Sequence, residues 1–385
     1  FFKTNSLPFS NVAIGFDYGT SNCSVAQMIN DQVQLIPLAG EDLFIPSSLC
    51  APTREVVTEY LFRHMDISPE NTISQGLLRN SINTNREEGF NVLADDLSFG
   101  KAAIAQYLED PTESYYVKSP KSFLGILNIN PMRLAIFEDL VCAMMANVKR
   151  SVEAKLDAAV DEAVIGRPVN FHNRGGEQSN QQAISILERA ARRAGFKQVE
   201  FLYEPVAAGL DFETKLTSEK TVLVVDVGGG TTDCSILKMG PQWLGKLERK
   251  SSMIAHSGKF VGGNDLDIGI AFKRIMAEFG KDTESLSGKP IPTMLFWDAV
   301  AINDVEAQKR FFAFDHYQSL KQTVVDAKDK VKLARMLRVY EDTLSYSLVQ
   351  HAENAKIALG DSSLYTAGID LTTELLNVDI SVEQM

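Results

Sequence analysis

The sequence contains no apolar run close to the roughly 18 residues that a membrane-spanning helix needs, so we expect no transmembrane segment. It also has no excess of positive charge, because its formal net charge is −12. An acidic chain is poorly suited to binding nucleic acid or an anionic membrane through its overall field. We therefore expect neither nucleic acid nor a membrane as a partner.

Cysteine is scarce, and Cys23, Cys50, Cys142 and Cys234 form no CxxC pair and no metal-binding spacing. We expect them to be small buried side chains in a reducing compartment. The opening residues 1–16 lack the charged segment and apolar stretch that mark a secretory signal. A cytoplasmic location is therefore the expectation.

What the chain does contain is a duplicated, glycine-bearing turn. Residues 222–239 read VLVVDVGGGTTDCSILKM, and residues 14–28 read IGFDYGTSNCSVAQM. Asp17 matches Asp226 and Gly19 matches Gly228, and each turn follows a short apolar run. Such runs favour buried strands, so each copy predicts a strand, a turn and a returning strand.

Glycine at these turns permits positive φ and lets backbone amides point into one concavity, a nest for phosphate oxygens. The hydroxyl groups of Thr20, Ser21, Thr231 and Thr232 add hydrogen-bond donors. A carboxylate at the end of each first strand can hold Mg²⁺, which keeps several waters and takes one or two carboxylates. Two facing turns of this kind predict a clamp for a Mg²⁺-nucleoside triphosphate.

Several stretches resemble one protein family. FDYGTSN and VVDVGGGTTD are similar to the two phosphate motifs of the actin, hexokinase and heat-shock ATPase superfamily. Five further stretches are similar to DnaK-type chaperones within this superfamily. They are KSFLG (121–125), AVIGRPVNF (163–171), ERAARRAGF (188–196), YEPVAAGLDFE (203–213) and VGGNDLDIGIA (261–271). The resemblance covers nearly all of residues 12–365. It is closest to the short DnaK relatives of the YegD type, which have no peptide-binding domain.

The resemblance implies an α/β, two-lobed, actin-like ATPase fold with a deep cleft between the lobes. Each lobe is ribonuclease H-like, with a five-stranded mixed sheet and flanking helices. We expect lobe I to span residues 1–217, with the first phosphate turn, the catalytic lysine and the connecting motif. Lobe II spans 218–385, with the second turn, and we expect its C-terminal part to be missing.

The resemblance also implies roles for individual residues. Asp17 and Asp226 hold the hydration shell of Mg²⁺, and Lys121, Asp233, Glu204 and Thr20 form the catalytic group. In that group, Lys121 positions the attacking water, Asp233 accepts its proton, and Glu204 holds water or metal between the lobes. Contacts to ATP or ADP come from Gly19, Thr20, Ser21, Asn22, Gly228, Gly229, Gly230, Thr231, Gly262, Gly263, Glu353 and Lys356. From the residues alone, Lys118 remains an alternative to Lys121.

Two features depart from the family pattern. Ile357 stands where DnaK-type proteins have an arginine that stacks on adenine, and Gly360 stands where they have a serine. The family's later adenosine motif, Gly-Gly-x-x-x-x-Pro, does not occur after residue 365. We expect weaker adenine affinity or a relaxed choice of base.

The predicted function is an ATP-binding, slowly hydrolysing nucleotide switch, a weak ATPase that resembles the nucleotide-binding domain of DnaK-type chaperones. A client or co-chaperone protein is the expected partner besides nucleotide. One alternative is an actin-like filament ATPase of the MreB or FtsA type, and another is a metabolite kinase on the same fold. The stretches KSFLG and ENAKIAL favour the chaperone type.

Two further segments carry structural expectations. Residues 131–150 have apolar side chains at helical spacing and predict an amphipathic helix whose Met144 and Met145 lie in the core. Residues 280–304 are interrupted by Gly, Ser and Pro and predict an inserted loop. We expect its apolar stretch MLFWDAV (294–300) to be buried rather than a partner surface.

Overall fold

The structure, a computed structural model, describes residues 12–30, 32–109, 113–171, 176–246, 249–259, 261–372 and 374–384. The chain divides into two compact units, residues 1–260 and 261–385. The predicted lobe boundary, between residues 217 and 218, lies just before the second copy of the repeated turn. It stays a prediction.

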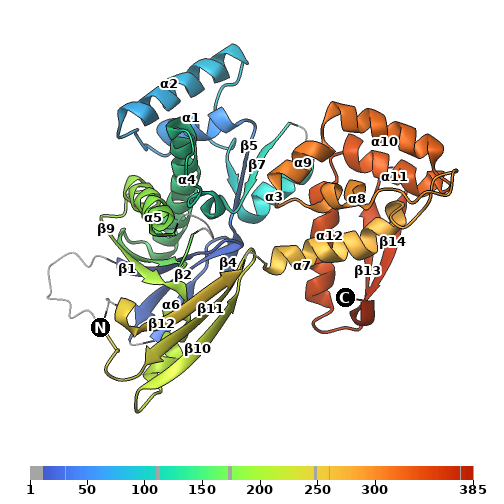
Figure 1. Cartoon of the computed structure of the whole chain (residues 1–385). Helices are drawn as coiled ribbons and strands as arrows, with labels where there is room; N and C mark the ends of the chain where they lie inside the picture. The colour runs from blue at the N-terminus through green and yellow to red at the C-terminus, as the bar shows by residue number, and fades with distance from the viewer. Residues whose placement is uncertain are drawn as a thin grey trace. The chain divides into compact units, whose positions relative to one another are not determined.

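The first unit contains a mixed sheet in the order β3-β2-β1-β8-β9 (Figure 1). The strands are β1 (Val12–Tyr18), β2 (Asn22–Ile29), β3 (Gln32–Ile36), β8 (Val160–Arg167) and β9 (Gln198–Tyr203). β1 is antiparallel to β2 and parallel to β8, and β8 is parallel to β9. A sixth strand, β4 (Phe44–Pro46), pairs with the start of β2. The prediction of five strands is therefore wrong by one short strand.

Two smaller sheets complete the strands of this unit. β10 (Lys220–Val227), β11 (Thr232–Met239) and β12 (Met253–Lys259) form an antiparallel sheet in that order. β5 (Ser48–Ala51) pairs with β6 (Ser98–Phe99) and with β7 (Tyr115–Lys118). Because the first unit extends to residue 260, both copies of the repeated turn belong to it.

The helices of the first unit surround a long central helix, α4 (Pro131–Leu156). The others are α1 (Arg54–His64), α2 (Thr72–Glu87), α3 (Gly100–Glu109), α5 (Gly176–Arg193) and α6 (Glu204–Thr214). α4 starts with proline at its first position, where the missing N–H costs nothing. Met144 and Met145 are fully buried, as predicted, but the helix has more than one buried face because α1, α2 and α5 all pack on it.

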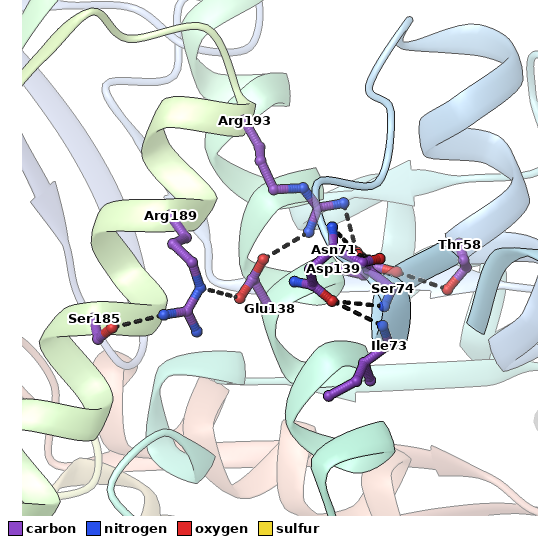
Figure 2. A network of polar contacts seen from close by, with 9 residues as sticks. All are labelled: Thr58, Asn71, Ile73, Ser74, Glu138, Asp139, Ser185, Arg189 and Arg193. Atoms are coloured by element: carbon purple, nitrogen blue, oxygen red, sulfur yellow. Dashed lines mark hydrogen bonds and ion pairs between the residues drawn. The ribbon is translucent and has the colours of Figure 1, made fainter. Parts of the chain in front are cut away.

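A buried ion network joins α1, α4 and α5 (Figure 2). Arg193 on α5 donates from Nη2 to Asp139 Oδ1 at 2.8 Å and from Nη1 to Glu138 Oε1 at 3.0 Å. Thr58 on α1 donates to the other oxygen of Asp139 at 2.9 Å, and Arg189 donates to Glu138 at 2.8 Å. Pairing of both buried carboxylates removes the large cost of leaving either one unpaired. The network therefore fixes the packing of these three helices.

The second unit is mainly helical. Its elements are α7 (Gly263–Ile270), α8 (Thr293–Val300), α9 (Val305–Phe311), α10 (Phe314–Asp326), α11 (Lys330–Glu341), α12 (Ser345–Ala358), β13 (Leu364–Asp370) and β14 (Leu375–Ser381). β13 and β14 form a separate two-stranded antiparallel sheet. Residues 218–385 thus show a three-stranded sheet in one unit and a hairpin in the other. The single five-stranded sheet expected there stays a prediction.

Residues 280–304 are not simply an inserted loop, because they include α8. The glycine, serine and proline residues of this segment lie before the helix, and Pro292 caps its start. Phe296 and Ala299 are fully buried, but Met294 and Trp297 are 59% and 39% exposed, so the prediction that the apolar stretch is internal is confirmed only in part. Within the described residues, no helix combines the length and apolar character needed to cross a bilayer. Cys23, Cys50 and Cys142 are buried as expected, whereas Cys234 is only partly covered.

Candidate functional site

The first turn joins β1 to β2. Asp17 pairs across the strands with Ser24, and Tyr18 with Cys23, which leaves residues 19–21 between the strands. Gly19 does not have positive φ, so it does not use the conformational freedom that glycine permits. A Cβ at Gly19 would lie 2.5 Å from the carbonyl oxygen of Asn22, a distance that real side chains do not reach. Glycine is required here for close approach of the backbone.

Neighbouring segments hold the carbonyl groups of this turn. Ser47 donates from its hydroxyl to Gly19 O at 2.6 Å and from its amide to Ser21 O at 2.8 Å. The Ser119 hydroxyl donates to Thr20 O. In a planar trans peptide the C=O and the following N–H point in opposite directions, and no peptide bond here is cis. Anchoring three successive carbonyls on one side therefore directs the following amides to the other side, as a phosphate nest requires.

The second turn joins β10 to β11 and is closed by its own backbone. Asp226 and Asp233 are directly opposite on the two strands, and Gly228 N–H donates to Thr231 O at 2.8 Å. The Thr231 side chain also hydrogen-bonds to Asp233. None of Gly228, Gly229 and Gly230 has positive φ. The glycines of the second turn therefore do not serve the backbone conformation that the sequence suggested.

The two turns lie against each other, which explains one of the glycines, Gly229. A Cβ on Gly229 would overlap the hydroxyl of Ser21, and one on Gly230 would lie 3.5 Å from the methyl group of Thr20. Gly229 thus permits a contact that any larger residue would prevent. The structure brings together the two copies of the repeat, with Asp17 and Asp226 at the ends of their first strands.

Lys121 is buried beside the first turn. It lies on a 3₁₀ turn, Pro120–Phe123, and is 5% exposed. Its Nζ donates to Tyr18 O at 2.8 Å and to Glu204 Oε1 at 2.6 Å, and lies 3.5 Å from Gly166 O. Glu204 is the first residue of α6, where the helix dipole favours a carboxylate. Lys121 therefore connects β1, β8 and α6, whereas Lys118 lies on β7, where it pairs with Ser48.

Three carboxylates at the two turns have raised pKa values. Asp17 is solvent-accessible, yet partial loss of solvation raises its pKa, Lys121 lowers it, and Glu204 and Asp226 raise it further. Loss of solvation raises the pKa of Asp226, Glu204 raises it further, and Lys121 lowers it. The pKa of Asp233 is raised by the same desolvation, against a hydrogen bond from Thr231. Glu204 contributes to all three shifts, so the predicted metal and catalytic carboxylates lie in one electrostatic cluster.

The cluster suits a cation held through water. It sets four carboxylates against one ammonium group, so a divalent cation would relieve their repulsion. In the ranges that the structure describes, no three His, Cys, Asp or Glu side chains converge as direct metal ligands. Mg²⁺ keeps several waters and takes one or two carboxylates, so Asp17 and Asp226 fit the ion without such a direct group.

Three residues of this region were missed from the sequence. Ser47 and Ser119 orient the first turn, but isolated serines in unremarkable surroundings give no signal in one sequence. Gly166 lies at the end of β8, where a Cβ would come within 3.4 Å of Glu204 and 3.8 Å of Asp17. Gly166 belongs to the stretch AVIGRPVNF (163–171), which resembles the family, but the sequence alone does not mark this glycine as a site residue.

A second buried ion pair lies at the opposite end of α6. Arg249 donates from Nη1 to Glu213 Oε2 at 2.9 Å and from Nη2 to Glu213 Oε1 at 2.8 Å. Gly240 N–H also donates to Glu213, and the Arg249 guanidinium lies 5.7 Å from the ring centre of Trp243. The helix that begins with Glu204 is therefore anchored at its end to the loop between β11 and β12.

The remaining predicted contacts belong to the second unit. Gly262 caps α7 and donates its N–H to Asp265 at 2.8 Å, and Lys356 Nζ lies 2.7 Å from the buried carboxylate of Asp267 and 3.4 Å from Gly263 O. Glu353 accepts a hydrogen bond from Gln350. Ile357 is 65% exposed on the same helix. The roles of these residues in holding adenosine stay predictions.

Comparison with known proteins gives concordant matches. The family model described as Hsp70 protein matches residues 128–290. Over 363 residues the chain is 27% identical to the chaperone protein DnaK of Psychrobacter cryohalolentis, covering 93% of this chain and 51% of that protein. This chain is related to the DnaK-type Hsp70 ATPase domain.

Two further relatives agree. The Hsp70-like chain is 27% identical over 317 residues to DnaK of Akkermansia muciniphila, covering 80% of this chain and 42% of that protein. It is 24% identical over 339 residues to the chaperone protein HscA homolog of Rickettsia bellii, covering 84% and 48%. The chain spans about half the length of the curated relatives it matches. The resemblance to DnaK-type Hsp70 proteins is confirmed, and it supports a nucleotide-binding, chaperone-like domain.

Proposed function

We propose that this protein is a nucleotide switch that binds Mg²⁺-ATP between its two turns and hydrolyses it slowly. The observation that carries the proposal is the direct contact between the turns, each with a carboxylate at its strand end, beside a buried lysine. Phosphoryl transfer needs positioning and charge neutralisation more than covalent chemistry. Here the two turns supply the positioning, and the buried lysine supplies the charge neutralisation.

Each part of the site has a task in this proposal. The amides directed away from the anchored carbonyls of residues 19–21 receive phosphate oxygens, and the second turn receives them from the opposite side. Asp17 and Asp226 orient the water shell of Mg²⁺, whose charge when bound offsets that of the phosphates. The ammonium of Lys121, fixed by Tyr18 and Glu204, holds the attacking water and balances charge in the transition state.

Asp233 is the proton acceptor in this scheme. Desolvation raises its pKa, and a carboxylate with a raised pKa is a better base near neutral pH than an ordinary one. Its hydrogen bond from Thr231 fixes the carboxyl group at the second turn. Thr20 completes the catalytic group from the first turn.

Binding energy can then act as a signal. Because the turns already touch, accommodating phosphates requires them to move apart, and hydrolysis allows them to return. The named relatives are chaperones, so a chaperone role in the cytoplasm, with a client or co-chaperone as partner, is part of the proposal. Ile357 is 65% exposed, and relaxed discrimination between ATP and GTP, expected from its replacement of an arginine, is part of the proposal.

The test compares thermal unfolding with Mg²⁺-ATP, ATP plus EDTA, and Mg²⁺ alone. Mg²⁺-ATP should raise the melting temperature most, because a ligand of the folded state stabilises it by mass action. Asp17→Asn should reduce that shift, whereas Asp211→Asn, an exposed carboxylate paired with Lys215 on α6, should leave it unchanged. Absence of any shift at millimolar Mg²⁺-ATP would contradict the proposal.

A further inference from the structure

A pocket of about 610 Å³ lies away from the turns, within the first unit. It is bounded by the beginning of α1, one face of α2, and the loop and first turn of α4 (Figure 1). A volume of this size is within the range of pockets that hold small organic ligands. None of the residues given a role in the nucleotide site lines it.

Two arginines and one carboxylate, that of Glu55, line the pocket, so its net charge is positive in an acidic protein. Arg54 is the first residue of α1, and Arg133 is the third residue of α4. Arg54 donates from Nε to Glu55 at 3.0 Å, so its charge is partly offset. Arg133 forms no ion pair with the part of the chain that the structure describes, and its guanidinium remains available. A guanidinium offers paired donors that match a carboxylate or phosphate.

The rest of the lining is partly apolar and partly hydrogen-bonding. Leu77 and Ile136 are 7% and 8% exposed and form apolar wall, to which Ile129 and Met132 contribute. Ser81 also lines the pocket while being only 2% exposed. A free inorganic ion would contact the arginines but leave these apolar surfaces wet. The lining therefore matches a ligand with an anionic group and a short apolar body.

We propose that this pocket is a second ligand site, which binds a small organic anion with an apolar body. Arg133 binds the anionic group, and the Leu77–Ile136 wall covers the apolar part. The loop that forms one edge of the site, Asn128 to Asn130, follows the Lys121 segment in the chain. Because no residue of the nucleotide site lines this pocket, we expect it to bind its ligand without nucleotide.

The experiment is a calorimetric and ligand-detected NMR titration of the full chain with N-acetyl-leucine, in the absence of nucleotide. Neutral N-acetyl-leucinamide tests the anionic group, and inorganic phosphate tests the apolar body. N-acetyl-leucine should bind saturably. Both other probes should bind about 10- to 100-fold more weakly, as loss of a charge-assisted hydrogen bond or of apolar burial predicts.

Arg133→Gln should weaken N-acetyl-leucine binding by a similar factor, and the exposed Arg79→Gln on α2, outside the pocket, should not change it. Because Arg133 is exposed, we expect its variant to fold, and its unfolding curve checks this. Absence of binding at millimolar N-acetyl-leucine, or equal binding by Arg133→Gln, would overturn the proposal. Equal affinity for the amide or for phosphate would overturn the ligand class. Since nucleotide is not added, failure here leaves the proposed ATP site untouched.

Discussion

At Gly19 an added Cβ would lie 2.5 Å from the carbonyl oxygen of Asn22, whereas at the matching Gly228 it would lie 3.4 Å from the carbonyl oxygen of Thr231. The same position in the two copies of the repeat thus meets the same kind of obstacle at different distances. The first turn is also held from outside by Ser47 and Ser119, while the second is closed by its own Gly228–Thr231 hydrogen bond. Similar sequences therefore give turns with different mechanical support, and we expect the first to be the more rigid.

The largest effect is expected at Lys121, which belongs to the side of the first turn. Lys121→Met should lower single-turnover hydrolysis about 10²–10³-fold, the scale for losing one electrostatic stabiliser. It should also destabilise the protein, because Glu204 would lose its buried partner. Lys118→Met is the matched control and should have little effect on either quantity.

The double variant Lys121→Met/Glu204→Gln separates the two roles of Lys121. Removing both charges should recover much of the stability without restoring hydrolysis. Full hydrolysis in the double variant, or a larger loss in Lys118→Met than in Lys121→Met, would assign catalysis to another group.

The matched pair Gly19→Ala and Gly228→Ala tests the difference in support directly. Gly19→Ala should lower the free energy of unfolding by about 1–3 kcal/mol or more, since its obstacle is backbone and cannot rotate away. Gly228→Ala needs a movement of only a few tenths of an ångström and should cost less. Equal costs in denaturant unfolding would show that the turns are equally supported.

A smaller effect, which a second substitution should reverse, is expected where Gly229 meets Ser21. Gly229→Ala should reduce stability and the Mg²⁺-ATP thermal shift, because its methyl group would overlap the Ser21 hydroxyl. Ser21→Gly removes the overlapping atoms, so the double variant should regain stability relative to Gly229→Ala. Gly230→Ala, with only an ordinary contact to Thr20, is the control. If Ser21→Gly gives no recovery, the two turns are not in contact in solution.

The smallest effect concerns the pH dependence of stability without nucleotide. An acid whose folded-state pKa is raised above its ordinary value of 3.8 makes stability fall as pH rises from that value through the folded pKa. Asp226→Asn should therefore be more stable than wild type at neutral pH and lose part of this decline. Asp17→Asn should change stability in the same direction, because loss of solvation also raises the pKa of Asp17 while Lys121 lowers it.

Denaturant unfolding from acidic to neutral pH measures both variants, with Asp211→Asn as an exposed control. If Asp226→Asn is less stable than wild type at neutral pH, its carboxylate is not destabilised by its surroundings.

The strands and turns around Asp17 and Asp226 were predictable because apolar runs, glycine and carboxylates follow one another within a few residues. The purpose of the glycines was not predictable, since a sequence does not show that Gly229 meets Ser21 from a segment some 200 residues away. The role of Lys121 in the site was anticipated only through resemblance, and its burial was not predicted, because lysine is ordinarily a surface residue. Ser47 and Ser119 act through hydroxyl contacts that leave no periodic pattern.

Elsewhere the limits have similar causes. The long helix α4 was predicted, but its burial on several faces depends on α1, α2 and α5 rather than on its own periodicity. The short β4 was not predicted, because three residues give too little pattern to identify a strand. The helix α8 was hidden by the glycine and proline residues that precede it.

The anchoring of α6 at both ends gives the protein a built-in optical signal. Glu204 and Glu213 are about 13 Å apart along the helix, and Glu213 holds Arg249 over the indole of Trp243. A displacement of α6 that begins at Glu204 would change the charge and polarity next to that indole. Trp243 is one of only two tryptophans, and the other, Trp297, lies on α8 in the second unit. In a Trp297→Phe background, intrinsic fluorescence would therefore follow events at the turns in real time without an added label.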